Sequence, residues 1–273
     1  MGKSETVQSL RRGLALLDAM ADGQGRGATL SELAERTGLS VSTTHRLLAT
    51  LMEDGFAIRD RDSGFYVPGH RTAGIAASVE RRTAYLRALA RPQLEKIAAE
   101  TGETTNLVVL DDVRAVYLDQ VPGARAVRMS SRIGSTFPAH CSGSAKAILA
   151  FQPDEALLNS LLAHAPLKRF TPETITTAGE LRTELDLVRQ RGYAIEREEY
   201  ESGVGCIAAP IRDSRGVAIA AISVPGPVQR ILGTEATRLG TLVLRRCEEI
   251  SRVLGYRPKE KPRRRSETGF AAQ

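Results

Sequence analysis

Residues 30–71 constrain the fold of this chain more than any other stretch. Within them, Leu30 and Leu33 are spaced so that one face of a first helix is apolar, and Gly38 is placed to end that helix and allow a sharp turn. Ser40 is a good N-cap for a second helix, which Gly55 would end. This order of helix, tight turn and helix is typical of a helix-turn-helix.

The second of these helices has two chemically different sides. Its leucines and Thr44 would share one face, which leaves polar side chains on the others. Hydroxyl groups at the start of a helix can approach phosphates and base edges closely, and an arginine one turn later can reach a guanine or a phosphate. We therefore expect this helix to recognise double-stranded DNA. The residues predicted to contact DNA from it are Ser40, Ser42, Thr43, His45 and Arg46.

A predicted hairpin follows the second helix. Phe56–Arg59 and Phe65–Pro68 have the composition of short strands and are separated by a turn cluster that contains glycine. Arg59 and Arg61 would lie near the tip, where a wing contacts the DNA backbone or the minor groove. Upstream, apolar residues repeat at helical spacing within 7–17 and predict a first helix that covers the module. The complete pattern is that of a winged helix-turn-helix.

The predicted DNA-binding module carries no net charge. Basic and acidic side chains cancel within residues 1–75, and the formal net charge of +6 comes mainly from residues 257–273. Neutralisation of phosphates supplies most of the non-specific affinity for DNA, so a single neutral module should bind weakly. We therefore expect a homodimer or homotetramer in which several modules act together.

The bulk composition favours a protein of the cytoplasm. A chain of 273 residues with 42% hydrophobic content can form one small and one medium domain. The N-terminus lacks the apolar region of a secretory signal, and no apolar run approaches the length of a membrane span. The three cysteines are widely spaced and odd in number, which fits free thiols. We expect cytoplasmic localisation and no membrane partner.

The predicted domain boundaries divide the chain into four parts. The winged helix-turn-helix would occupy 1–72, a linker helix 73–90, and a larger domain 91–256, before a basic tail, 257–273, that we expect to be disordered. The linker would be interrupted at Pro92, which starts a second helix. Two roles remain open for the linker: pairing across subunits, or packing within its own domain.

Beyond the linker the pattern predicts an α+β fold with a mainly antiparallel sheet. Short apolar runs alternate with turn clusters, and longer segments with helical spacing lie between them. The predicted strands are 106–110, 115–121, 127–133, 193–199, 204–211 and 217–224, and the predicted helices are 142–150, 154–163, 179–191 and 235–254.

At both ends the chain resembles the IclR family of transcriptional regulators. SLRRGLALLDAM and LSELAERTGLSVSTTHRLLATLMEDGF resemble its DNA-binding domain, and FPAHCSGSAKAILA and GYAIEREEYESGVGCIAAPIRDSRGVAIAAISVPGP resemble its effector-binding domain. The resemblance implies a winged helix, a linker helix and a GAF-like α/β effector-binding domain. It also implies dimers that associate into tetramers, and a ligand-responsive regulator of a catabolic operon, either a repressor or an activator.

The resemblance further implies a ligand pocket over the concave face of the sheet. Unpaired N–H groups at the start of the helix after Ser142 would favour an anion, so the expected effector is a small organic acid, a carboxylate or aromatic-acid-like metabolite. Pro225 removes a hydrogen-bonding group where the family often has serine, which favours a ligand with more apolar surface than two-carbon or three-carbon acids. We expect the ligand to order a loop over Thr136–Cys141. The residues implied by the resemblance are His140, Cys141, Ser142, Gly143, Ser144, Glu196, Val204, Cys206 and Ser223.

Other interpretations of these residues remain open. From the residues alone, Ser142 could be a plain helix cap and Ser223 a hydrogen-bonded sheet serine. His140, Cys141 and Cys206 could form a metal sensor, although their spacing matches no known zinc motif. A thiol enzyme is the weaker alternative, because no motif supplies an acid or base partner. We predict no enzyme activity, no catalytic residue, no metal ligand set and no cofactor.

Overall fold

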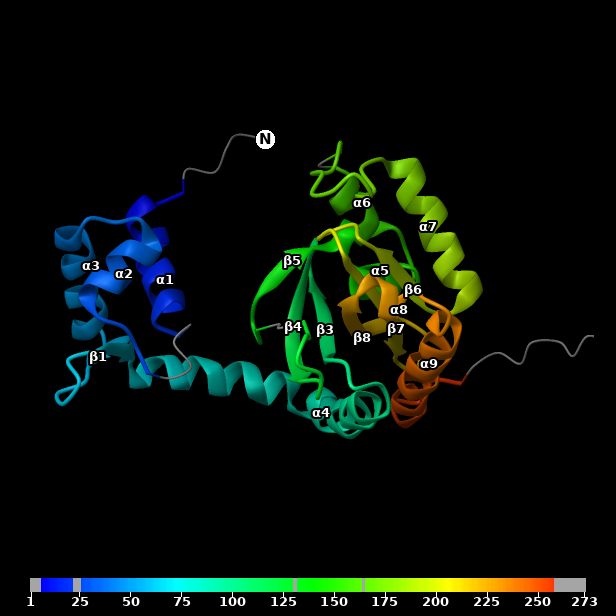
Figure 1. The fold of residues 1–273 in the computed structure, drawn as a ribbon, viewed down its shortest axis with the longest axis horizontal. Helices are drawn as coiled ribbons and strands as arrows, with labels where there is room; N and C mark the ends of the chain where they lie inside the picture. Colours follow the sequence, from blue (N-terminus) through cyan, green and yellow to red (C-terminus); the bar gives the residue numbers. More distant parts are fainter. Residues whose placement is uncertain (1–5, 22–25, 130–131, 164, 258–273) are drawn as a thin grey trace, which may run out of the picture. The chain divides into compact units, whose positions relative to one another are not determined.

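The chain folds into two compact units, Met1–Ala84 and Tyr85–Gln273 (Figure 1). The computed structural model describes residues 6–21, 26–129, 132–163 and 165–257. The predicted disordered tail lies outside the described residues, apart from Arg257.

The N-terminal unit is a winged helix-turn-helix, as predicted. It contains the helices α1 (Gln8–Ala21), α2 (Leu30–Thr37) and α3 (Val41–Glu53), followed by the strands β1 (Ala57–Arg59) and β2 (Tyr66–Pro68). The two strands pair antiparallel and form the wing.

Local signals in the sequence account for the ends of α2 and α3. Thr29 and Glu32 form a reciprocal capping box at the start of α2, and Gly38 ends it with a φ of 65°. The Ser40 hydroxyl caps α3 by accepting a hydrogen bond from the Thr43 amide at 3.3 Å. These caps fix the tight turn between the two helices.

The core of this unit forms where the three helices meet the wing. Leu16, Met20, Leu33 and Leu48 are fully buried there. Thr44 is also fully buried, and its hydroxyl donates to the Ser40 carbonyl oxygen at 3.0 Å. The polar atom is therefore satisfied within the helix, and Thr44 fits the core without an unpaired group.

The expected break in the linker is wrong. A single helix, α4 (His70–Thr101), runs through Pro92. Proline removes one hydrogen bond from a helix interior, but Leu94 and Ile97, just beyond it, are fully buried against the C-terminal sheet and hold this part of the helix in place. Gly102, with a φ of 72°, ends the helix.

The C-terminal unit is built on one antiparallel sheet, as predicted. Its strand order is β5-β4-β3-β8-β7-β6, and every neighbouring pair is antiparallel. The strands are β3 (Thr105–Asp111), β4 (Arg114–Val121), β5 (Thr136–Pro138), β6 (Ala194–Arg197), β7 (Val204–Arg212) and β8 (Ala218–Pro227).

One edge of the sheet differs from the prediction. The described residues of 127–133 form no strand, and Val127 and Ile133 are more than half exposed, so their apolar side chains do not find a buried surface. The edge strand is instead β5, which pairs with β4. The segment Thr136–Cys141, expected to be a loop, consists of β5 followed by a short 3₁₀ turn, η1 (Ala139–Cys141).

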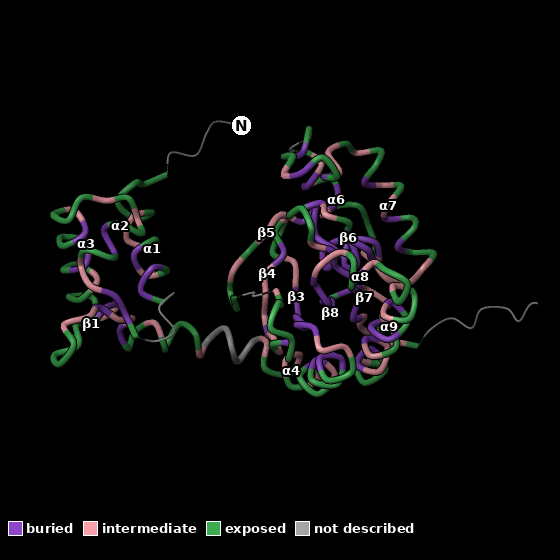
Figure 2. The backbone as a smooth tube through the Cα atoms, viewed as in Figure 1, coloured by how far each residue is buried: buried purple, intermediate pink, exposed green. Residues whose placement is uncertain are grey.

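Helices cover both faces of this sheet (Figures 1 and 2). One core lies between the sheet and the helices α5 (Gly143–Leu149), α6 (Ala156–Leu162) and α7 (Ala178–Arg191). The opposite core lies under the second half of α4, α8 (Val228–Ile231) and α9 (Ala236–Val253). Alternation along the strands divides the side chains: Ala208 enters the first core, and Ile207 and Ala209 enter the second.

Candidate functional site

The start of α3 presents an exposed polar surface. Ser42, His45 and Arg46 are exposed, and the structure therefore leaves them on the side predicted to face DNA. Ser40 is differently placed, because its hydroxyl already accepts from the Thr43 amide and donates to the Thr43 hydroxyl at 2.9 Å. Ser40 and Thr43 thus shape the helix start, while the other three side chains extend from it.

The two wing arginines have different surroundings. Arg59 donates from Nε to the Gly64 carbonyl oxygen at 3.1 Å and lies over the Tyr66 ring, 5.7 Å from its centroid. Arg61 is exposed in the turn itself. Asp60 holds this turn by accepting from the Ser63 amide and hydroxyl, and these hydrogen bonds lower the pKa of its carboxyl group. Arg59 therefore stiffens the wing, and Arg61 is the cation that its tip presents.

The sequence interpretation missed one exposed residue of this surface. Val41, the first residue of α3, is 52% exposed beside the polar groups. An apolar side chain at this place can contact the methyl group of thymine in the major groove. The sequence could have indicated this exposure, because Val41 directly follows the predicted N-cap Ser40.

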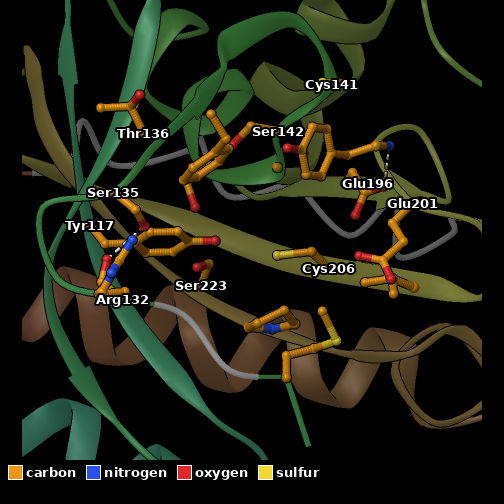
Figure 3. Close-up of a pocket in the computed structure, with 17 residues that line it drawn as sticks. Tyr117, Arg132, Ser135, Thr136, Cys141, Ser142, Glu196, Glu201, Cys206 and Ser223 are labelled. Atoms are coloured by element: carbon orange, nitrogen blue, oxygen red, sulfur yellow. Dashed lines mark hydrogen bonds between the residues drawn. The ribbon is translucent and has the colours of Figure 1, made fainter. Parts of the chain in front are cut away.

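A pocket of about 400 Å³ opens in the C-terminal unit where the β4–β5 segment, the start of α5, and strands β6, β7 and β8 meet (Figure 3). All of the predicted ligand residues except His140 line it. These are Cys141, Ser142, Gly143, Ser144, Glu196, Val204, Cys206 and Ser223.

His140 lies outside the wall of this pocket. Its side chain is buried, Nε2 lies 2.9 Å from the Lys168 carbonyl oxygen, and its ring packs near that of Phe170. Burial lowers the pKa of the imidazole and so favours its neutral form. The structure does not bring His140 to the pocket wall, because the 3₁₀ turn directs this ring into the protein behind the pocket.

Strand register brings the other residues together. Cys206 is the partner of Glu196 on one side and of Pro225 on the other, so these three form one row across the sheet. A β-carbon on Gly143 would lie 3.4 Å from Glu196 and 3.5 Å from the Cys206 sulfur, at ordinary van der Waals distance. The start of α5 therefore lies directly against this row.

The polar groups of the pocket separate by charge. In Figure 3, Tyr117, Arg132 and Ser135 lie together, whereas Glu196 and Glu201 lie on the other side of Ser223 and Cys206. One end of the pocket thus offers a cation with hydroxyl groups, and the opposite end offers a pair of carboxyl groups.

The Glu196 carboxyl group is held partly by backbone. Its Oε1 accepts from the amides of Glu199 at 2.6 Å and Tyr200 at 3.4 Å. Burial, followed by repulsion from Glu199, nevertheless raises the pKa of Glu196 to about 7. This group therefore changes charge near neutral pH, at the wall of the pocket.

A buried ion pair lies directly behind this wall. Lys146 of α5 is fully buried, and its Nζ donates to Glu199 Oε1 at 2.5 Å and to the Ile195 carbonyl oxygen at 2.8 Å. The second Glu199 oxygen, Oε2, is buried without a hydrogen-bond partner among the described residues. Because a buried cation needs its partner, this pair ties α5 to the segment after β6.

Other residues of the pocket were not named among the predicted ligand residues. Thr136 and Phe137 lie in the segment that the ligand was expected to order, and Pro225 departs from the usual serine. The others come mostly from the segment before β5 and from the turn after β6, where the sequence has no motif. The additional lining residues are Tyr117, Met129, Arg132, Ser135, Thr136, Phe137, Tyr200, Glu201 and Pro225.

The cysteines do not support the metal or thiol alternatives. Cys141, Cys206 and Cys247 are buried free thiols, and burial raises the pKa of each, to about 12 for Cys141 and Cys247. A raised pKa disfavours the thiolate that a nucleophile or metal ligand requires. Within the described ranges, no group of three or more His, Cys, Asp or Glu side chains is arranged to hold a metal ion.

Across the part of the chain that the structure describes, no helix combines the length and apolar character needed to cross a membrane.

Two family profiles match the chain. The profile described as the IclR helix-turn-helix domain matches residues 9–61, and the one described as the bacterial transcriptional regulator IclR C-terminal domain matches residues 80–252. Together they span both units.

Relatives in sequence and structure agree with these profiles. The chain is 39% identical over 251 residues to the acetate operon repressor of Salmonella typhimurium, covering 91% of this chain and 90% of that protein. The crystal structure of Thermotoga maritima IclR has a TM-score of 0.72 at 36% identity and matches 91% of this chain and 99% of its own. An IclR homolog from Microbacterium hydrocarbonoxydans, complexed with 4-hydroxybenzoate, has a TM-score of 0.70 at 28% identity, with coverage of 90% and 99%.

Proposed function

The chain belongs to the IclR family of DNA-binding transcriptional regulators of catabolic operons, and we propose that the pocket of its C-terminal unit binds a small organic acid that alters promoter binding by the winged helix. The metabolite would enter between the start of α5 and strands β6 to β8.

The separation of charge in the pocket is the observation that carries this proposal. A carboxylate would be held at the end with Arg132, by its guanidinium and the nearby hydroxyl groups of Tyr117 and Ser135. At the other end, Glu196 and Glu201 can accept a hydrogen bond from a hydroxyl group of the ligand. A hydroxy acid with its two polar groups at opposite ends fits this distribution best.

The apolar part of the wall favours a ligand with a substantial apolar body. Met129, Phe137, Val204 and Pro225 line the pocket between or beside the polar groups. A volume of about 400 Å³ is in the range of pockets that enclose small organic ligands. The related protein solved with 4-hydroxybenzoate supports an aromatic acid as one member of this class.

A chain of hydrogen bonds offers a route from the pocket floor to α4. Asn106 is paired with Ser223 across the sheet, and its Oδ1 accepts from Gln120 Nε2 at 3.2 Å. On α4, Arg91 donates to the Gln120 carbonyl oxygen and to Asp119 Oδ1, both at 3.1 Å. A ligand that moves this part of the sheet would therefore move α4, the helix that leads to the winged helix.

The DNA contacts follow from the exposed surface of the N-terminal unit. We infer that Ser42, His45 and Arg46 enter the major groove and that Arg61 contacts the backbone beside it. Because residues 1–75 carry no net charge, two or more copies of the chain would act together on one operator. Binding to promoter DNA would take place in the cytoplasm.

Calorimetric titration of the full chain with a panel of carboxylates tests the proposal. We expect benzoate and 4-hydroxybenzoate to bind more tightly than glyoxylate, and Ser223→Ala to weaken binding by a few-fold, as the loss of one hydrogen bond would. Ser160→Ala, on the surface of α6, is the matched control and should titrate like the parent.

Two outcomes would contradict the proposal. If only glyoxylate-sized acids bind, the apolar body is not recognised. If no carboxylate binds at all, the ligand class is wrong.

A further inference from the structure

A second pocket, of about 590 Å³, lies in the C-terminal unit and shares no lining residue with the first. It is formed by the end of α7, the turn between β7 and β8, one side of α9 and the residues after α9. Its wall contains a cluster of arginines from all of these segments except α9. They are Arg189, Arg191, Arg212, Arg215 and Arg257.

Nearby carboxylates neutralise only part of this cluster. Three of the arginines form ion pairs, and Glu248, the acidic side chain in the wall, pairs with Arg252 outside it. Arg212 and Arg257 have no acidic partner within the described residues. The ion pairs are Arg189–Asp186, Arg191–Glu184 and Arg215–Asp213.

Two aromatic rings hold the Arg212 guanidinium in a fixed orientation. Its guanidinium lies 4.2 Å from the centroid of the Phe151 ring and 4.6 Å from that of Tyr256, and it donates to the Tyr256 hydroxyl at 2.7 Å. That is its only side-chain hydrogen bond to the described residues, although a guanidinium has five N–H donors. The two rings therefore orient a cation whose remaining donors can serve a ligand.

The turn beside Arg212 adds further donors. Asp213 Oδ1 accepts from the amides of Arg215 and Val217, both at 3.0 Å, which fixes the turn. Ser214 is exposed at the pocket, and its hydroxyl has no hydrogen-bond partner in the described part of the chain. Gly216, with a φ of 85°, presents no side chain there.

We propose that this pocket binds the phosphate group of a small anionic ligand. The guanidinium fork matches phosphate oxygens in a bidentate way that a lysine cannot. A phosphate monoester carries nearly two negative charges at neutral pH, which the two arginines without acidic partners would balance. The volume exceeds what phosphate alone needs and leaves room for the rest of a phosphorylated metabolite.

Calorimetric titration of the full chain with inorganic phosphate, glycerol 3-phosphate and glycerol tests this proposal. We expect saturable binding of one phosphate group per chain and none of glycerol. The double variant Arg215→Gln/Arg257→Gln should bind at least about tenfold more weakly, because it removes charge-assisted hydrogen bonds from exposed positions that do not support the core. Arg182→Gln is the matched control, because Arg182 lies on α7 outside the pocket and pairs with Glu155.

The result for each ligand identifies the source of the phosphate. Tighter binding of glycerol 3-phosphate indicates a phosphorylated metabolite, and tighter or equal binding of inorganic phosphate indicates the free ion. Absence of saturable binding, or equal binding by the double variant and the parent, overturns the proposal. A titration with heparin is the control for non-specific polyanion binding. Binding of heparin without binding of either phosphate ligand would also overturn the proposal. Benzoate titrations of the same variants should match the parent, which separates this pocket from the effector pocket.

Discussion

The winged helix and the C-terminal unit build their binding surfaces in different ways. The exposed groups proposed to contact DNA lie within one helix and one turn, between Val41 and Arg61. The proposed effector pocket takes its wall from segments that extend from Tyr117 to Pro225. The first surface is local along the chain and exposed, whereas the second is assembled by the sheet from both buried and exposed residues.

This difference has a consequence for mutation. Arg46 and the other exposed side chains of α3 take no part in the core, which Thr44 and Leu48 enter from this helix. Their loss should therefore weaken DNA binding without affecting stability. Behind the effector pocket, the Lys146–Glu199 pair connects the wall to the fold, so changes there should affect stability as well.

Lys146→Ala should destabilise the C-terminal unit by about 3–5 kcal/mol, because it leaves the buried Glu199 carboxylate without its cation. Thermal unfolding followed by calorimetry measures the effect, and the winged helix should keep its own stability. The double variant Lys146→Met/Glu199→Gln should recover part of the loss. A single variant as stable as the parent would show that the pair does not support the pocket.

Arg46→Ala should weaken specific DNA binding by about 1–3 kcal/mol, roughly tenfold to a hundredfold, and leave benzoate affinity unchanged. A gel-shift titration on the natural operator, together with calorimetry, gives both values. Arg11→Ala removes the same charge from the exposed side of α1 and is the control. Equal loss of DNA and benzoate binding would argue against separate surfaces.

Arg91→Ala should leave the affinities for operator DNA and for benzoate nearly intact, but should reduce the effect of bound benzoate on operator affinity. It removes the hydrogen bonds from α4 to Asp119 and to the Gln120 carbonyl oxygen. Allosteric coupling is typically about 1–3 kcal/mol, so the change in operator affinity caused by saturating benzoate should fall by several-fold. Glu95→Gln is the control, because it breaks only the exposed ion pair of Arg91. Unchanged coupling would exclude this route.

Glu196→Gln should remove a modest pH dependence of benzoate binding. The pKa of Glu196 is raised to about 7 by burial and by Glu199, so the neutral acid is favoured below this pH and the carboxylate above it. Affinity for an anionic ligand should therefore decrease as the pH rises from about 6 to about 8, because like charges repel. In the variant, titrations over this interval should coincide. A parent chain without this decrease would show that the charge of Glu196 does not act on the bound ligand.

The same raised pKa has a defined effect on stability. An unfolded glutamate ionises near its ordinary pKa of 4.5, whereas Glu196 in the fold retains its proton to about 7. The contribution of this group to stability is therefore lost progressively as the pH rises between these values.

Local patterns in the sequence predicted the elements that depend on nearby residues. Gly38 and Ser40 determine the turn before α3, because a left-handed residue and a hydroxyl cap act within one helical turn. Continuous apolar runs bounded by turn residues likewise identified β7 and β8, and the resemblance to a family identified most of the pocket residues. These signals lie within short windows of the chain.

Other features depended on tertiary packing. Pro92 should interrupt a helix by local rules, but burial of Leu94 and Ile97 keeps α4 continuous. Val127 is of a residue type that favours strands, yet it is exposed, and β5 forms the edge strand beside β4. His140 lies in a motif beside pocket residues, but the 3₁₀ turn directs it inward. In all three cases the burial of side chains against the rest of the fold, and not the local sequence, determined the structure.

Short windows of the chain were enough to predict the winged helix, the antiparallel sheet and the exposed polar groups at the start of α3, because hydrogen bonds and apolar periodicity act over a few residues. The tertiary structure was needed to bring together the separated charges of the proposed effector pocket, the buried Lys146–Glu199 pair and the arginine pocket between α7 and the end of α9. Their members lie tens of residues apart in sequence, and the register of the strands and the packing of helices on the sheet bring them together.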